Sequence, residues 1–217
     1  MVCREQLDGW TAPEPAAFSA GFSAHEPHVT RDNKRIYWGW FRPVPAGEPK
    51  PPQGDYGIYV AERTASGWSE ARYVGQGMFV SSSRDGEIYV TDTSEGAQGN
   101  GYLARAVMAD GRFARLGRLQ GGIAKYRETV KWIAHPCIAP DGSYILFDNG
   151  NGQMQVSFRN QGGEWGSSID LTRHGIDPNG GIASITPDGK YLFYRAGSDT
   201  YWVSTAVIEE ARPGALK

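Results

Sequence analysis

The sequence predicts an all-β protein, specifically a β-propeller built from four-stranded antiparallel blades. Three observations support this fold: the composition favours turns and aromatic strands, one segment type recurs along the chain, and each copy has the residue pattern of a β-hairpin. The 217 residues include 29 Gly, 13 Pro, 11 Tyr, 8 Phe and 7 Trp. Glycine and proline form turns and aromatic residues favour strands, so this composition indicates many short strands joined by tight turns.

A repeated segment marks the blades. Each copy has a short apolar strand, a turn containing aspartate, and a strand of aromatic and β-branched residues, which together predict a hairpin. The turn aspartates are Asp32, Asp85, Asp141 and Asp188, so successive copies are 53, 56 and 47 residues apart, a spacing typical of propeller blades. We assign these aspartates to turn formation rather than catalysis. The four copies are HVTRDNKRIYW from His28, SSSRDGEIYVT from Ser81, CIAPDGSYILF from Cys137 and SITPDGKYLFY from Ser184.

Two more strands are expected after each hairpin, which completes a four-stranded blade. The third strands are predicted at residues 57–61, 101–105, 154–158 and 201–204. A fourth strand that begins near a tryptophan or phenylalanine is predicted at residues 67–70, 112–115 and 164–167. The last copy has no fourth strand, and a single short helix is expected near residues 207–211 instead.

The closing segment PDGKYLFYRAGSDTYWVSTAVIEEARP resembles the last repeat of bacterial TolB-like, WD40-like propeller proteins, which ends with a strand and a short polar helix. The segments GWTAPEPAAFSA, GWSEARYV and EWGSSIDLT are similar to outer strands of those repeats. The resemblance extends from Val2 to Pro213. It implies a propeller fold and a periplasmic or exported location, although MVCREQLDGW at the N-terminus does not have the pattern of a signal peptide. It says little about function, because propellers serve many unrelated functions.

We expect one propeller domain over residues 1–217, with about four blade equivalents. Residues 1–20 are interpreted as the end of a split or incomplete blade, because Met1 aligns with the middle of a third strand and Trp10 with the start of a fourth. Residues 21–77, 78–131 and 132–180 are the next blades, and residues 181–213 are the last one. Two arrangements are open: an N-terminal strand pairs with the last blade and closes the ring, or the chain is an arc of a larger ring.

Four polar residues are the candidates for chemistry: His25, Glu26, His28 and His135 precede or open first strands. First strands line the central channel of a propeller, so side chains from distant repeats converge there. Such a cluster has the groups for acid and base catalysis or for ligand binding. The alternative is that these residues are polar channel residues without a chemical role. No metal site is predicted, because neither HxH nor HExxH spacing occurs.

Two aromatic residues, Tyr37 and Trp40, are candidates for ligand binding, since aromatic rings stack on saccharides. Alternating aromatic residues in strands also form the core between blades, and this interpretation competes with the first. Trp40 lies at a strand end beside residues 41–55, a long Pro- and Gly-rich loop. Such a loop acts as a lid, as a partner-binding segment or as a simple insertion.

The remaining features limit the function classes. The net charge of −2 does not favour nucleic acid, and no apolar run reaches the length needed to cross a membrane. Cys3 and Cys137 are expected to be unpaired, and no nucleophile-elbow or phosphate-binding motif points to a catalytic site or to a cofactor. We therefore predict a noncatalytic binding or scaffold module that uses a propeller face or channel mouth for a protein or saccharide partner. The alternative is a propeller enzyme, a hydrolase or lyase acting on a carbohydrate or lactone through the channel histidines.

Overall fold

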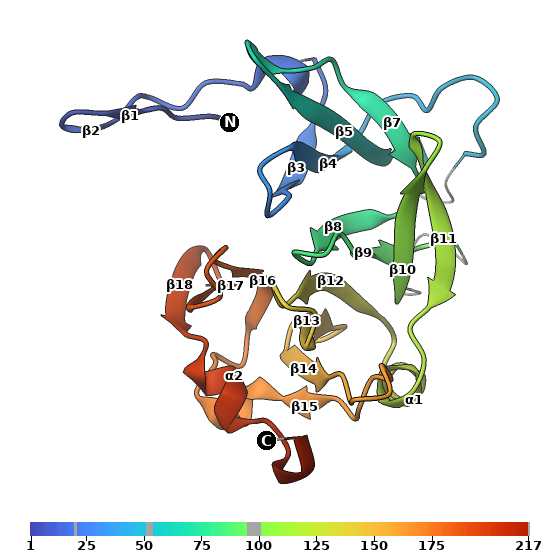
Figure 1. The fold of residues 1–217 in the computed structure, drawn as a ribbon, viewed down its shortest axis with the longest axis vertical. Helices are drawn as coiled ribbons and strands as arrows, with labels where there is room; N and C mark the ends of the chain where they lie inside the picture. Colours follow the sequence, from blue (N-terminus) through green and yellow to red (C-terminus); the bar gives the residue numbers. More distant parts are fainter. Residues whose placement is uncertain (20, 51–53, 95–100, 217) are drawn as a thin grey trace.

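The computed structural model describes the chain except residues 20, 51–53, 95–100 and 217. Four small antiparallel sheets fan around one centre, as in a four-bladed β-propeller, and this confirms the predicted fold (Figure 1). We number the sheets blades 1 to 4 in chain order. The first strand of each blade lies nearest the centre, and the later strands follow outward.

The strands of each blade follow one another in sequence order, so every blade is a meander of antiparallel hairpins. Blade 1 contains β3 (Ala24–Val29), β4 (Arg35–Trp40), β5 (Gly57–Thr64), β6 (Gly67–Trp68) and β7 (Arg72–Gly75), with β6 and β7 both paired to β5. Blade 2 contains β8 (Met78–Ser82), β9 (Ile88–Asp92), β10 (Tyr102–Ala109) and β11 (Arg112–Arg118). Blade 3 contains β12 (Ile133–Ile138), β13 (Tyr144–Asn149), β14 (Met154–Phe158) and β15 (Ile169–Asp170), and blade 4 contains β16 (Gly180–Ile185), β17 (Tyr191–Ala196) and β18 (Asp199–Ser204).

Helical segments connect and cap the blades. The helix expected near residues 207–211 is confirmed as α2 (Ala206–Glu210), but the expectation of a single helix is wrong, because α1 (Gly122–Thr129) lies between blades 2 and 3. Helix α1 buries Ile123 against the core there, and Tyr126 packs on the same cluster one turn later. No helix in the described part of the chain is long and apolar enough to cross a membrane. The described part of the chain also contains the 3-10 turns η1 (Ala17–Ser19), η2 (Leu171–His174) and η3 (Gly214–Leu216).

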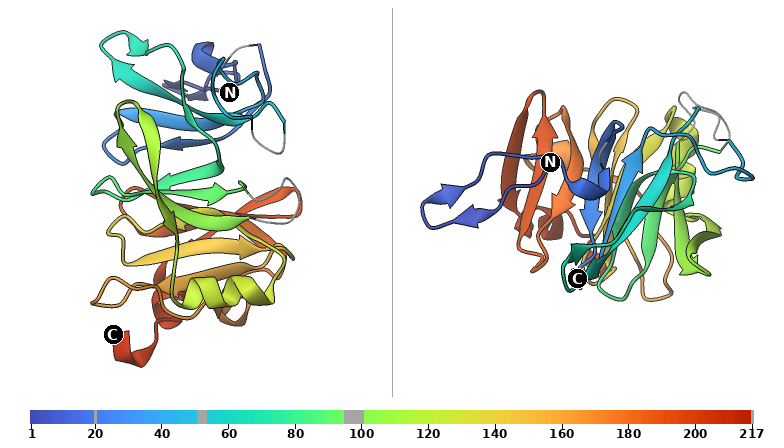
Figure 2. Two further views of the ribbon diagram at one scale, coloured as in Figure 1. Left: turned by 90° about the vertical axis from the view of Figure 1, so that its right-hand side faces the viewer. Right: turned by 90° about the horizontal axis from the view of Figure 1, so that it is seen from above.

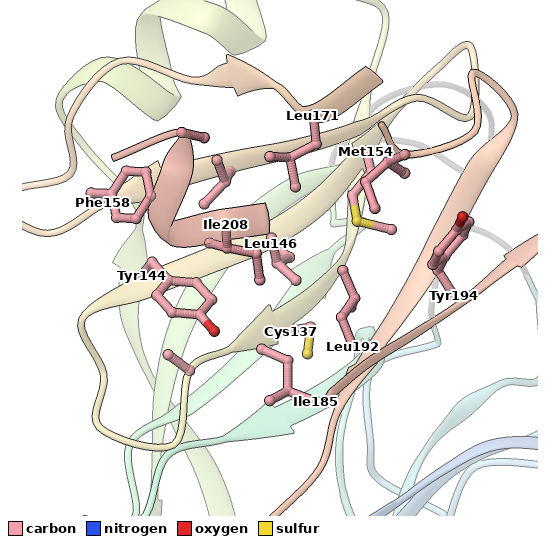
Figure 3. Close-up of a cluster of buried hydrophobic side chains, with 14 of the residues drawn as sticks. Cys137, Tyr144, Leu146, Met154, Phe158, Leu171, Ile185, Leu192, Tyr194 and Ile208 are labelled. Carbon is pink, nitrogen blue, oxygen red and sulfur yellow. The ribbon is translucent and has the colours of Figure 1, made fainter. Parts of the chain in front are cut away.

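The core is divided into layers that lie between successive blades. On the second strands of blades 1, 2 and 3, Tyr37, Tyr89 and Leu146 occupy the same register position, opposite His28, Ser81 and Cys137. All three side chains are fully buried, and each belongs to the cluster shared with the next blade. Figure 3 shows the layer between blades 3 and 4, where Leu146 packs near Leu192 and Ile208.

The N-terminal segment forms a hairpin of its own. Strand β1 (Glu5–Gln6) pairs with β2 (Gly9–Trp10), and Val2 bridges to Glu14. This hairpin extends beyond the four blades (Figure 2). Among the described residues, the sheet of blade 4 consists of β16, β17 and β18, so the pairing of an N-terminal strand with the last blade is not the arrangement observed. Blades 1 and 4 are instead linked by Arg31, whose Nη1 donates to the Ile185 carbonyl at 2.9 Å.

Replacement of Leu146 by Ala tests the layered core. The substitution leaves a cavity between blades 3 and 4, so we expect the free energy of unfolding to fall by about 2–5 kcal/mol. The matched control is Leu116→Ala, because Leu116 is 54% exposed on β11 and buries little surface. Urea unfolding followed by circular dichroism measures both variants, and equal losses for the two would contradict this assignment of the core.

Candidate functional site

A β-bulge interrupts the innermost strand of every blade at the same place. The pairing register of β3 shifts between His25 and His28, and β8, β12 and β16 shift at matching positions. One residue in each bulge has a left-handed backbone, which costs a non-glycine residue about 1–3 kcal/mol. These residues are Glu26 (φ 54°), Phe79 (φ 55°), His135 (φ 53°) and Ile182 (φ 54°).

The four bulge residues line one cavity of about 670 Å³ at the centre of the propeller. Because a bulge breaks the alternation of the strand, it re-aims one side chain per blade. His28, Arg31, Ser81 and Cys137 also line this cavity. The site therefore combines a carboxylate and an imidazole, from the bulges of blades 1 and 3, with apolar groups from the bulges of blades 2 and 4.

Polar side chains of neighbouring blades hold two of the bulges in place. The His135 N–H donates to Thr91 Oγ1 at 3.2 Å, and the Ile182 N–H donates to Asp148 Oδ2 at 3.3 Å. Thr91 and Asp148 occupy the same register position on the second strands of blades 2 and 3. The blade-to-blade contact thus fixes where the bulge residues lie.

His135 lies between two carboxylates. Its Nδ1 donates to Asp148 Oδ1 at 2.7 Å, and its Nε2 lies 3.6 Å from Glu26 Oε1. The Phe79 ring lies against the imidazole, with 3.8 Å between ring centroids. Burial opposes protonation, but the interactions with Asp148 and Glu26 outweigh it and raise the pKa of His135 to about 9. The ring is therefore an imidazolium at neutral pH.

His28 has the opposite environment. Its Nε2 lies 2.8 Å from Ser82 Oγ, which joins blades 1 and 2. Burial, with a smaller contribution from the Arg31 charge, lowers the pKa of His28 to about 4. The ring is neutral at pH 7, so one histidine of the cavity is charged and the other is not.

Other groups at the cavity have little reactivity. Burial raises the pKa of the Cys137 thiol to about 11, so the thiol stays protonated at neutral pH. Cys3 and Cys137 are both free, as predicted. Within the described residues, no group of three or more His, Cys, Asp or Glu side chains is arranged to hold a metal ion.

The structure brings together three of the sequence-predicted residues. Glu26, His28 and His135 line the cavity, whereas His25 stacks on Phe41 at 5.1 Å between centroids and does not line it. Tyr37 is buried in the cluster between blades 1 and 2, and Trp40 is buried in a cluster of blade 1. The Arg42 guanidinium lies 4.5 Å from the Trp40 ring centre, and residues 51–53 of the loop after Trp40 lie outside the described part.

Sequence reasoning missed Phe79, Ile182 and Asp148. Each bulge residue lies six positions before a turn aspartate, so the spacing of Glu26 and His135 already specifies Phe79 and Ile182. Histidine and glutamate are recognised as candidate site residues because their side chains titrate. Phenylalanine and isoleucine do not titrate, so the sequence does not mark them as candidates. Asp148 carried no signal, since its contact with His135 depends on the pairing register of the sheet.

Comparisons with known proteins support the fold alone. No family model matches the sequence, and no curated protein matches it. Among solved structures, a protein from Lactobacillus plantarum is 15% identical, with a TM-score of 0.50, over 93% of this chain and 59% of its own. TolB from Acinetobacter baumannii is 17% identical (TM-score 0.49; 84% and 41% covered), and a puromycin hydrolase is 16% identical (TM-score 0.49; 88% and 28% covered). The chain spans less than two thirds of each of these structures.

The raised pKa of His135 predicts a loss of stability at alkaline pH. The ordinary pKa of histidine is 6.5, so the stabilisation by Asp148 and Glu26 is fully present below pH 6.5 and is lost as pH rises through about 9. The difference in unfolding free energy between wild type and His135→Gln should shrink by about 3 kcal/mol between pH 6.5 and 10. Urea titrations at each pH measure it, and a difference independent of pH would contradict the charged state of His135.

The lowered pKa of His28 predicts a loss of stability at acidic pH. The unfolded chain binds the proton from pH 6.5 downward, whereas the folded ring resists it until about pH 4, so stability is lost as pH falls across this window. His28→Gln, which keeps a polar group near Ser82, should flatten the decline by up to about 3 kcal/mol. NMR titration of the His28 ring protons checks the pKa directly, and a value near 6.5 would contradict the prediction.

Proposed function

We propose that the protein is a noncatalytic binding module whose central cavity binds a hydroxyl-bearing ligand, with a saccharide as the first candidate. The observation that carries the proposal is the pairing of the His135 imidazolium with Glu26. The 3.6 Å between Nε2 and Oε1 exceeds a good hydrogen bond, so both groups keep capacity for a ligand. A hydroxyl placed between them accepts from the imidazolium and donates to the carboxylate.

The apolar bulge residues complete this site. Phe79 and Ile182 line the same cavity as His135 and Glu26. An aromatic face beside a donor and an acceptor suits a sugar, whose ring is apolar on its C–H face and polar at its rim. A serine, threonine or tyrosine hydroxyl of a protein partner has the same donor and acceptor chemistry.

The protonation states argue against catalysis by His135. A general base must be able to accept a proton at the working pH, and an imidazolium stabilised by two carboxylates does not. Cys137 is not a nucleophile either, because its thiol stays protonated. The cavity is thus better suited to holding a ligand than to transforming it.

One observation favours the second candidate function, a hydrolase or lyase acting on a carbohydrate or lactone. Neutral His28 lies 2.8 Å from the Ser82 hydroxyl, as a base lies beside a nucleophile. Ser82 is only 2% exposed, however, and the contact also serves to join blades 1 and 2. Solved structures similar to this chain include TolB and an enzyme, puromycin hydrolase, so fold similarity does not decide between the two functions.

Binding to an array of immobilised mono- and oligosaccharides tests the proposal, with titration calorimetry on the best-bound sugar. Glu26→Gln and His135→Gln should each weaken binding by about 10-fold or more, because each removes one charged hydrogen-bond partner. The matched control is Glu70→Gln, since Glu70 is exposed and lies outside the cavity.

Two outcomes would contradict the proposal. In the first, no sugar binds, or the Glu26 and His135 variants bind as tightly as wild type. In the second, wild type cleaves a nitrophenyl glycoside or a simple lactone and His28→Ala abolishes the reaction, which would favour the enzyme.

A further inference from the structure

The N-terminal hairpin is a copy of the outer hairpin of blade 1, displaced by 58 residues. VCREQLDGWTAPE from Val2 corresponds to VAERTASGWSEAR from Val60. The turn glycines Gly9 and Gly67 have φ values of 138° and 137°. Glu5 faces Trp10 as Arg63 faces Trp68, and the register then shifts by one residue in both hairpins, so that Val2 meets Glu14 and Val60 meets Arg72.

The hydrogen bonds of the two hairpins also correspond. The Thr11 N–H donates to the Arg4 carbonyl at 2.9 Å, and the Ser69 N–H donates to the Glu62 carbonyl at 2.8 Å. Thr11 Oγ1 and Ser69 Oγ each accept from the backbone of the same partner at 3.0 Å. Even the ion pair recurs with its charges exchanged, as Arg4 with Glu14 and Glu62 with Arg72. Residues 2–14 therefore have the form of the third and fourth strands of a blade.

Blade 1 shows what such a hairpin pairs with. The inner edge of β5 pairs with β4, with Ala61 opposite Ile36, and the Arg63 N–H donates to the Lys34 carbonyl at 2.8 Å. The corresponding residues are Cys3 and Glu5, and no strand among the described residues pairs with that edge of β1.

The opposite edge of the hairpin is blocked. The Glu14 N–H points inward, to the Val2 carbonyl at 3.0 Å. Its neighbours Pro13 and Pro15 therefore occupy outward positions, where they cannot donate to another strand. Only the inner edge of the hairpin is open to a new strand.

Blade 4 has an uncovered face that matches the buried faces of the other blades. Phe193 lies opposite Ser184, in the register position of Tyr37, Tyr89 and Leu146. Those three side chains are 0% exposed, whereas Phe193 is 39% and its cross-strand neighbour Trp202 is 63% exposed. Tyr191 extends the same aromatic face, edge-on to Trp202 at 5.3 Å.

Blade 4 also has an exposed polar residue at a position that contacts the next blade elsewhere in the molecule. Arg195 corresponds in register to Thr91 and Asp148, which accept from the bulge N–H of the next blade. The Arg195 side chain is exposed, and its Nε donates to the nearby Gly197 carbonyl instead. The exposed face of blade 4 is thus the counterpart of the face that blades 1, 2 and 3 each bury against the next blade.

We propose that the side of the molecule between blade 4 and blade 1 binds an antiparallel β-hairpin of a partner polypeptide, which completes a fifth blade. One strand of that hairpin pairs with the inner edge of residues 2–6, as β4 pairs with β5. Its aromatic and β-branched side chains cover Phe193 and Trp202. A second copy of this chain does not fit the site, because its own inner strands already belong to its four sheets.

The probe for this proposal is a fluorescein-labelled peptide of residues 24–40, the β3–β4 hairpin of this chain. Fluorescence anisotropy should show saturable one-to-one binding to the full chain. Phe193→Ser with Trp202→Ser should weaken it by at least about 10-fold. Glu5→Pro should weaken it similarly, because proline removes an N–H at the open edge. The matched control Leu116→Ser, on the exposed part of β11, should bind as wild type does.

Circular dichroism melting shows whether each variant is folded, and a scrambled peptide measures nonspecific binding. The proposal is overturned if the peptide binds no better than the scrambled one, or if the Phe193 and Trp202 substitutions leave binding unchanged. It is also overturned if sedimentation shows a dimer that these substitutions dissociate, since the aromatic face then belongs to a second copy.

Discussion

Tyr37, Tyr89 and Leu146 occupy one position in three blades, on the face of the second strand that the next blade covers. A small sheet with two apolar faces is stable only when a neighbour covers each of them. The contact between successive blades therefore supports everything else: it buries the large side chains, it sets the distance between innermost strands, and it determines which side chains meet at the centre. At Phe193 and Trp202 of blade 4, which no further sheet of the described residues covers, the same surface is exposed.

The central cavity is a consequence of this repeated contact. Four bulges at equal depth give Glu26, Phe79, His135 and Ile182 the same left-handed backbone, and each occupies a conformation that its residue type disfavours. Two of these bulges are held by Thr91 and Asp148 from the preceding blade. The strain is thus supported by the interface between blades, which also keeps His135 and Glu26 within 3.6 Å of each other although more than a hundred residues separate them in sequence.

The two histidines of the cavity show how environment decides the protonation state of a side chain. Both are partly buried, but His135 has two carboxylates beside it, whereas His28 has a hydroxyl and a nearby guanidinium. The first is held charged and the second neutral at pH 7. A fixed charge paired with a carboxylate is suited to recognising hydroxyl groups, which both donate and accept hydrogen bonds.

The sequence by itself determined the all-β class, the repeat and the hairpins, because these depend on local turn chemistry and on residues a few positions apart. It also singled out His25, Glu26, His28 and His135, because the first strands of a propeller line its channel. Of these four residues, His25 does not line the cavity. The sequence did not identify Asp148, Phe79 or Ile182 as part of the site, and it left the position of the N-terminal hairpin open. Those features depend on pairing register, on bulges and on which blade faces are covered, and such contacts between distant residues exist only once the sheets have packed.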